Sequence, residues 1–106
     1  MVLLIEDLVS IQNILEKNTY TLIDFTASWC GPCKHIGPIF EELSKQYVNV
    51  MCVKVDVDKP ETKELCSLCK VRSMPTFMLI KNGQIINQFS GASKENLIKM
   101  LEMTKH

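Results

Sequence analysis

Cys30 and Cys33 lie three residues apart at the predicted start of a helix, a pattern that can carry out redox chemistry. The first turn of a helix has unpaired N–H groups and a partial positive charge, and both stabilise a thiolate. Gly31 and Pro32 separate the cysteines and suit this turn, because proline lacks only an N–H group that the first turn leaves unused. The spacing also lets the second sulfur reach the first. We therefore predict that one thiolate attacks a substrate disulfide and that the other cysteine resolves the mixed disulfide.

A zinc site and a pair of inert cysteines are the alternatives at this position. Structural zinc takes four ligands, and Cys66 and Cys69 offer a second pair. However, 32 residues separate Cys33 from Cys66, whereas common zinc modules separate their ligand pairs by roughly 12–20 residues. The second pair is also expected within a helix. Redox chemistry without a bound metal is therefore the favoured interpretation, and the two alternatives stay open.

The composition restricts the class of protein. The 106 residues suit a single domain, residues 1–106. Twelve basic and twelve acidic side chains give no net charge, which argues against a nucleic-acid partner. No apolar run approaches the roughly 18–20 residues that span a bilayer, so we expect no membrane association.

The location is expected to be cytoplasmic. The first residues, MVLLIED, contain no basic segment and only a short apolar run, unlike a secretory signal. The chain has five cysteines, and an odd number cannot pair completely within one secreted disulfide framework. Both observations favour a reducing compartment.

Strands and helices alternate along most of the chain. The hydrophobic pattern predicts strands at residues 2–5, 20–27, 50–57, 76–81 and 84–89. It predicts helices at residues 6–17, from the cysteine pair to about residue 47, at 60–69, and after a capping Ser93. Such alternation gives parallel strand pairs, and the hairpin signal Asn82-Gly83 adds an antiparallel pair. We therefore predict an α/β fold with a mixed sheet of about five strands and about four helices on its two faces.

Some details of these elements are also predicted. Glu6 and Asp7 are expected in the first turn of the first helix, where they suit its dipole. Pro38 lies inside the second helix and should bend it. His106 ends the chain and is expected to be disordered.

Asp24 interrupts the apolar run of residues 20–27. A lone carboxylate in a buried strand is costly, and burial should raise its pKa. A carboxyl group with a raised pKa can accept a proton near neutral pH. Asp24 is therefore a candidate catalytic residue.

Several segments together resemble the thioredoxin family. Residues 24–34 (DFTASWCGPCK) are similar to its active-site segment, and residues 54–58 (KVDVD) to its third strand. Residues 74–77 (MPTF) resemble its cis-proline loop, and residues 81–83 (KNG) and 91–92 (GA) its hairpin and following turn. The motifs keep the family's order over nearly the whole chain, and the methionine before the proline is similar to cytosolic eukaryotic members. The resemblance implies a thioredoxin fold and protein-disulfide reductase activity.

The resemblance also implies roles at the redox centre. Cys30 would be the attacking thiolate with an exposed sulfur, and Cys33 the buried resolving thiol. Asp24 would exchange a proton with Cys33 through water, with Lys54 near its carboxylate. A structural ion pair between Asp24 and Lys54 is the alternative interpretation, and the two can coexist.

The same resemblance implies a surface on which substrates dock around the sulfur of Cys30. Pro75 would be cis and would present the backbone of Met74 to the main chain of the substrate. Trp29 would flank the sulfur, although an aromatic side chain here could equally cover the core. The implied docking residues are Trp29, Gly31, Pro32, Met74, Pro75, Gly91 and Ala92.

The resemblance names partners as well. It implies disulfide-containing target proteins, recycling by thioredoxin reductase with electrons from NADPH, and a monomer. No cofactor should be bound, because the dithiol itself carries two electrons and the chain has no Gly-rich dinucleotide fingerprint. Two other functions stay open: an oxidase or isomerase on the same scaffold, and a module that binds a partner in one redox state without turnover.

Three further cysteines lie outside the motif. Cys52 falls in a strand and is expected to be buried packing. Cys69 shares a helical face with apolar residues, whereas Cys66 stands at the edge of that face and is expected to be more exposed. Both are candidate regulatory thiols: Cys66 because of its expected exposure, and Cys69 because the resemblance to animal cytosolic members places it at a position linked to oxidative regulation, although Ser73 occupies another position that is often cysteine in them.

Overall fold

The strands of the chain form one mixed sheet. The computed structural model describes residues 1–105; His106 lies outside the described residues. Within them the sheet has five strands in the order β1-β3-β2-β4-β5. The strands are β1 (Leu3–Ile5), β2 (Tyr20–Thr26), β3 (Val50–Asp56), β4 (Thr76–Lys81) and β5 (Gln84–Ser90). The central β2 runs parallel to β3 and antiparallel to β4, which confirms the predicted mixed sheet.

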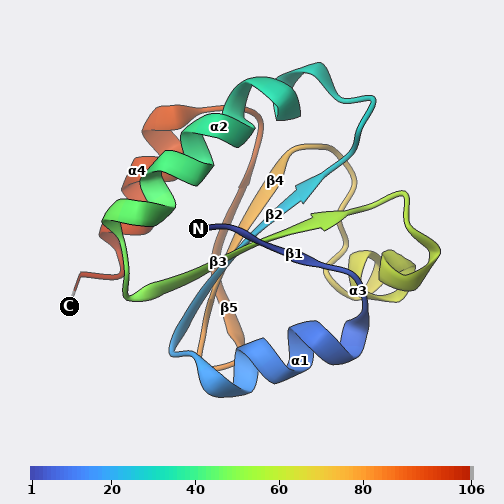
Figure 1. Cartoon of the computed structure of the whole chain (residues 1–106), viewed down its shortest axis with the longest axis horizontal. Coiled ribbons are helices and arrows are strands. Elements are labelled where there is room, and N and C mark those ends of the chain that lie inside the picture. Colours follow the sequence, from blue (N-terminus) through green and yellow to red (C-terminus); the bar gives the residue numbers. More distant parts are fainter. Residues whose placement is uncertain (106) are drawn as a thin grey trace.

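The helices cover both faces of this sheet, as predicted (Figure 1). They are α1 (Leu8–Lys17), α2 (Gly31–Gln46), α3 (Lys63–Leu68) and α4 (Lys94–Glu102), with a short 3₁₀ helix at Pro60–Thr62. The helices α2 and α4 lie together on one face, and α1 and α3 lie on the other. No helix within residues 1–105 has the length and apolar character needed to cross a membrane.

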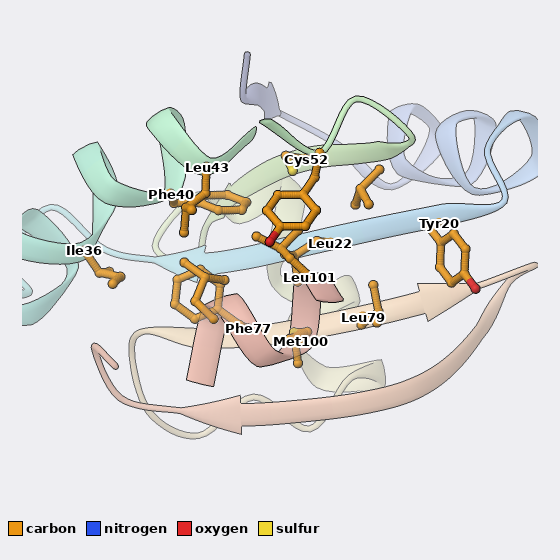
Figure 2. Close-up of a cluster of buried hydrophobic side chains, with 13 residues drawn as sticks. Tyr20, Leu22, Ile36, Phe40, Leu43, Cys52, Phe77, Leu79, Met100 and Leu101 are labelled. Atoms are coloured by element: carbon orange, nitrogen blue, oxygen red, sulfur yellow. The ribbon is translucent and has the colours of Figure 1, made fainter. Parts of the chain in front are cut away.

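Helical spacing of apolar residues builds the core between the sheet and α2 (Figure 2). Ile36, Phe40 and Leu43 recur on one face of α2 and are buried. The ring of Phe40 meets that of Phe77 from β4 edge to face, with the centroids 5.4 Å apart. This packing fixes α2, and with it the cysteines at its start, against the sheet.

Two helix boundaries differ from the prediction. The carboxylate of Asp7 accepts a hydrogen bond from the amide of Ser10 at 2.8 Å, so Asp7 caps α1 and Glu6 precedes the helix. The expectation that both acids lie in the first turn is therefore wrong. The predicted helix 60–69 is divided into the 3₁₀ turn and α3, and Cys69 is the C-cap. Lys70 then takes a left-handed conformation, with φ at 56°.

Two other details agree with the sequence. The hydroxyl of Ser93 accepts a hydrogen bond from the amide of Asn96 at 3.1 Å and caps α4. Pro38 lies inside α2, near its middle, as its place in the sequence predicts, and the bend at this residue stays a prediction.

Candidate functional site

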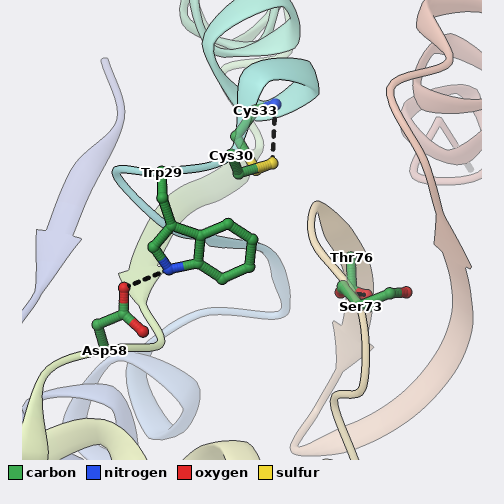
Figure 3. Close-up of a disulfide and its surroundings, with 6 residues drawn as sticks. All are labelled: Trp29, Cys30, Cys33, Asp58, Ser73 and Thr76. Carbon is green, nitrogen blue, oxygen red and sulfur yellow. Dashed lines mark hydrogen bonds between the residues drawn. A yellow bond between two sulfur atoms is a disulfide. The ribbon is translucent and has the colours of Figure 1, made fainter.

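Cys30 and Cys33 form a disulfide at the start of α2 (Figure 3). Cys30 is the N-cap, and its sulfur accepts a hydrogen bond from the amide of Cys33 at 3.2 Å. On reduction, a Cys30 thiolate would keep this amide donor and the favourable end of the helix dipole. In this oxidised form Cys30 is 4% exposed and Cys33 is 5% exposed. Cys30 is therefore buried here, whereas the resemblance implied an exposed sulfur.

The two cysteine pairs of the zinc alternative do not meet. Cys66 and Cys69 pack beside the apolar cluster between the sheet and α1, whereas Cys30 and Cys33 belong to a separate cluster. Within residues 1–105 no three His, Cys, Asp or Glu side chains are grouped so that they could hold a metal ion. The structure offers no four-ligand centre for these cysteines.

Asp24 lies in the middle of the central strand β2 and is 2% exposed. Its Oδ1 atom is buried without a hydrogen-bond partner among the described residues. Burial raises the pKa of this carboxyl to about 7, against a smaller opposing effect of the positive charge on Lys54. The raised pKa agrees with the sequence prediction.

Lys54 stands beside Asp24 in the parallel register of β2 and β3. Its side chain is exposed, and within the described chain no ion pair of 4.0 Å or less joins it to Asp24. A structural ion pair is therefore not what holds the carboxylate. The positive charge of Lys54 lowers the pKa of Asp24 without an ion pair between the two side chains.

A pocket of about 560 Å³ connects the buried acid to the redox pair. Asp24, Cys33 and Lys54 all line it, together with Asp56 at the end of β3. The volume has room for several water molecules, and the carboxylates of Asp24 and Asp56 in its lining can accept hydrogen bonds from them. A proton can thus pass between Asp24 and Cys33 without direct contact of the two side chains.

Trp29 lies beside the disulfide and is 65% exposed, so it does not cover the core. Its indole Nε1–H donates to Oδ2 of Asp58 at 2.7 Å (Figure 3). Asp58 was not among the residues predicted for the site. The available signal was its position just after β3, because parallel strands β2 and β3 end at the same edge of the sheet.

The peptide bond between Met74 and Pro75 is cis, as the resemblance implied. Met74 packs against the cluster that contains Cys30 and Cys33. The carbonyl of Pro75 accepts a hydrogen bond from the amide of Gly91 at 2.9 Å. Gly91 has φ at +104°, a conformation that favours glycine. This contact joins the proline loop to the turn after β5.

The remaining predicted docking residues occupy different surroundings. Gly31 and Pro32 are exposed in the first turn of α2, next to the disulfide. Ala92 is half-buried and packs against the core on the face of α2 and α4. Beside these residues, the hydroxyl of Thr76 donates to the carbonyl of Ser73 at 2.6 Å, a bond within the loop that contains Pro75.

The other cysteines are in less reactive surroundings. Cys52 is buried in β3, and burial raises its pKa to about 12. Cys66 and Cys69 are both half-buried, and burial raises the pKa of each. The expected difference in exposure between Cys66 and Cys69 is therefore small.

These environments predict an order of alkylation in the reduced protein. At pH 7 a thiol with a pKa of about 12 has a thiolate fraction of about 10⁻⁵. We expect iodoacetamide to label Cys30 first, Cys66 and Cys69 more slowly, and Cys52 not at all while the protein is folded. Mass spectrometry of peptides over time measures the order, and a urea-unfolded sample serves as the control. Labelling of Cys52 as fast as Cys30 in the folded protein would contradict the assignment.

Comparisons with known proteins agree with this geometry. The thioredoxin family model matches residues 6–103. A thioredoxin of Ictalurus punctatus is 48% identical over 101 residues, which are 92% of each chain. A thioredoxin of Homo sapiens is 44% identical over 99 residues, again 92% of each chain.

The fold is shared as well. The structure of Plasmodium falciparum thioredoxin superposes with a TM-score of 0.92 at 37% identity, and the match covers 97% of this chain and 99% of that one. The five-stranded sheet and its helices are thus the thioredoxin fold. The chain therefore belongs to the thioredoxin family of thiol-disulfide oxidoreductases, which reduce disulfide bonds in other proteins.

Proposed function

We propose that Cys30 is the attacking thiolate and Cys33 the resolving thiol of this reductase. The main support for this proposal is the position of the pair at the start of α2. There the sulfur of Cys30 already accepts a hydrogen bond from the amide of Cys33, which would stabilise a thiolate on Cys30. The Cys30 thiolate attacks one sulfur of the target disulfide, and the other target sulfur leaves as a thiolate that takes a proton. The Cys33 thiolate then attacks the sulfur of Cys30 and releases the second target thiol. Two electrons pass to the target, and the disulfide of the protein forms.

Asp24 supplies the proton transfer that the second step needs. Cys33 must lose its proton before it can attack, and a carboxylate whose pKa is about 7 can accept it near neutral pH. The pocket that Asp24 and Cys33 share supports a route through water. Lys54 supports the ionised form of Asp24 by its charge.

The docking surface comprises Trp29, Gly31, Pro32, Met74, Pro75, Gly91 and Ala92. The hydrogen bond to Asp58 orients the indole of Trp29 next to the disulfide. The contact of Met74 with the disulfide cluster supports pairing of its backbone with the main chain of the substrate. Cys66 and Cys69 are candidate regulatory thiols that react with oxidants more slowly than the pair of Cys30 and Cys33.

The reductase cycle also needs a source of electrons. We assign this to thioredoxin reductase and NADPH, with no cofactor bound by this chain, which acts as a monomer with a single domain. A cytoplasmic location fits the odd number of cysteines and the methionine before Pro75. Membership of the thioredoxin family supports each of these assignments.

An equilibrium redox titration of Cys30 and Cys33 against defined dithiol buffers tests the direction of the reaction. We expect a two-electron midpoint near the roughly −270 mV of thioredoxins. A midpoint at the roughly −120 to −180 mV of oxidases and isomerases would mean that the protein works in the opposite direction. The variant Cys69→Ser is the control, since Cys69 lies outside the titrating pair and should leave the midpoint unchanged.

A further inference from the structure

The outer wall of the pocket beneath the redox pair comes from the first residues of the chain. Val2 and Leu4 line the pocket together with Asp24 and Cys33. Leu4 pairs with Lys54, which in turn pairs with Asp24, so the three residues form one row across parallel strands. Side chains in such a row lie on the same face of the sheet. The amino-terminal segment, residues 1–4, thus borders the pocket on the side away from β4.

Glu41 fastens this segment to α2. The amide of Val2 donates to both carboxylate oxygens of Glu41, at 3.3 and 3.2 Å. One turn further along the helix, the amino group of Met1 donates to the hydroxyl of Ser44 at 2.9 Å. Glu41 also lines the pocket itself. The carboxylate therefore links the segment that precedes a short edge strand to the helix that contains the cysteines, and this contact between Val2 and Glu41 is called the clip.

Residues 1 and 2 contact the rest of the fold through the hydrogen bonds to Glu41 and Ser44 and through packing of the Val2 side chain against the apolar cluster on the face of α2 and α4. The pairing of β1 with β3 begins at Leu3 and covers three residues. If the contact with Glu41 is lost, the end of the chain can move away, and the pocket, which otherwise has room for only several water molecules, opens to bulk solvent on this side. Asp24 would then lose part of the burial that keeps its carboxyl neutral.

We propose that Glu41 is a positioning residue for the proton transfer, because it holds the amino-terminal segment closed over the pocket that joins Asp24 to Cys33. The inference rests on the proposed function for the use of Asp24 as a base, but the clip can be measured separately. Glu41 does not touch the reacting sulfurs; it acts through the segment that it holds.

The charged and titratable groups around Asp24 come from three directions. Lys54 and Asp56 line the pocket from β3, and Cys33, Lys34 and Glu41 line it from α2. The amino group of Met1 lies at the outer side, next to Ser44. Removing Glu41 therefore changes both a charge and a hydrogen bond, and the experiment must separate the two effects.

Three variants separate them. Glu41→Ala removes the charge and the hydrogen bond, whereas Glu41→Gln removes the charge and keeps an oxygen that can accept the amide of Val2. Val2→Pro removes the amide donor of residue 2 and keeps the charge of Glu41. If Glu41→Ala does not fold, Val2→Pro still tests the proposal. Glu42→Ala is the matched control, because this exposed neighbour pairs with Lys45 and does not line the pocket.

The measurement is an NMR titration of the Asp24 carboxyl carbon in the oxidised protein. We expect Glu41→Ala and Val2→Pro to lower the midpoint by about one pH unit, since the carboxyl is then more exposed to bulk solvent. Glu41→Gln and Glu42→Ala should stay close to the parent protein. Equal shifts in Glu41→Ala and Glu41→Gln would assign the effect to charge and overturn the proposal. An unchanged midpoint in both Glu41→Ala and Val2→Pro would overturn it as well.

A second readout distinguishes this proposal from the proposed function. The rate at which Cys33 resolves a mixed disulfide with a model peptide is measured against pH in the same variants. A lower Asp24 midpoint with a matching shift of this pH profile supports both assignments. A lower midpoint with an unchanged profile supports the clip and removes Asp24 from the role of the base.

Discussion

Replacing Cys33 with serine will trap the protein on its targets as covalent complexes. In Cys33→Ser the thiolate of Cys30 can still attack a target disulfide, but no second thiol is present to release the product. We expect catalytic reduction of a protein disulfide to fall by at least about 10³-fold. Mixed disulfides that disappear on treatment with excess dithiol should accumulate instead. Non-reducing electrophoresis followed by mass spectrometry detects them and identifies the linked cysteine.

Two controls define what this experiment tests. Cys30→Ser should lose the same activity and form no covalent complex, because it lacks the attacking group. Cys69→Ser should keep full turnover, since Cys69 lies against a different cluster from the redox pair. If Cys33→Ser gives only noncovalent complexes whose formation depends on redox state, the protein is a redox-dependent binding module rather than a reductase.

Replacing Asp24 with asparagine should make the folded protein more stable at high pH while slowing its chemistry. The folded-state pKa of Asp24 is about 7, above its ordinary value of 3.8. Between these two values the folded state binds more protons than the unfolded state, so the stability of the parent protein falls as pH rises. The contribution of Asp24 to stability is complete below pH 3.8 and is lost as pH passes through about 7.

The expected size follows from the same linkage. At about 1.4 kcal/mol per pH unit, the raised pKa corresponds to a cost of about 4 kcal/mol once the carboxyl is ionised. Asp24→Asn removes this cost, so we expect a gain of that order at pH 8 and little gain at pH 3. Urea unfolding of the oxidised proteins at both pH values measures it. Glu16→Gln, at an exposed carboxyl of α1, is the control and should change stability little at either pH.

The same variant should slow the resolving step. Removal of a general base typically costs about 10²-fold or more. We expect the release of target from the mixed disulfide to slow by about that factor at pH 7 and to recover as pH approaches the pKa of the Cys33 thiol. Equal stability of Asp24→Asn and the parent at pH 8 would mean that the pKa of the Asp24 carboxyl is not raised to about 7. An unchanged release rate would exclude Asp24 as the base.

Most of the fold could be predicted from local patterns in the sequence. The buried strand β2 is a nearly continuous apolar run, and β3 alternates apolar residues with Lys54 and Asp56. The hairpin is marked by Asn82-Gly83, and Ser93 marks the start of α4. The ends of helices are predicted less accurately where a polar side chain forms a hydrogen bond with a backbone amide. Asp7 caps α1 from outside because its carboxylate reaches the amide of Ser10, which a pattern of apolar residues does not register.

The centre of the site could also be predicted, but its supports could not. The cysteines and the lone acid of β2 stand out by residue type and local context. The bond from Trp29 to Asp58 and the clip from Val2 to Glu41 join residues 29 and 39 positions apart. Such pairs depend on how the strands and α2 are placed in space. Nothing in the local sequence of Glu41 distinguishes it from the exposed Glu42.

The sulfur of Cys30 is supported by the main chain rather than by a neighbouring side chain. Its hydrogen-bond donor is the amide of Cys33, and the helix dipole belongs to the backbone of α2. Substitutions at the exposed Lys34 and His35 leave both in place. The main-chain part of the support for the Cys30 sulfur therefore does not depend on which side chains stand at these two exposed positions.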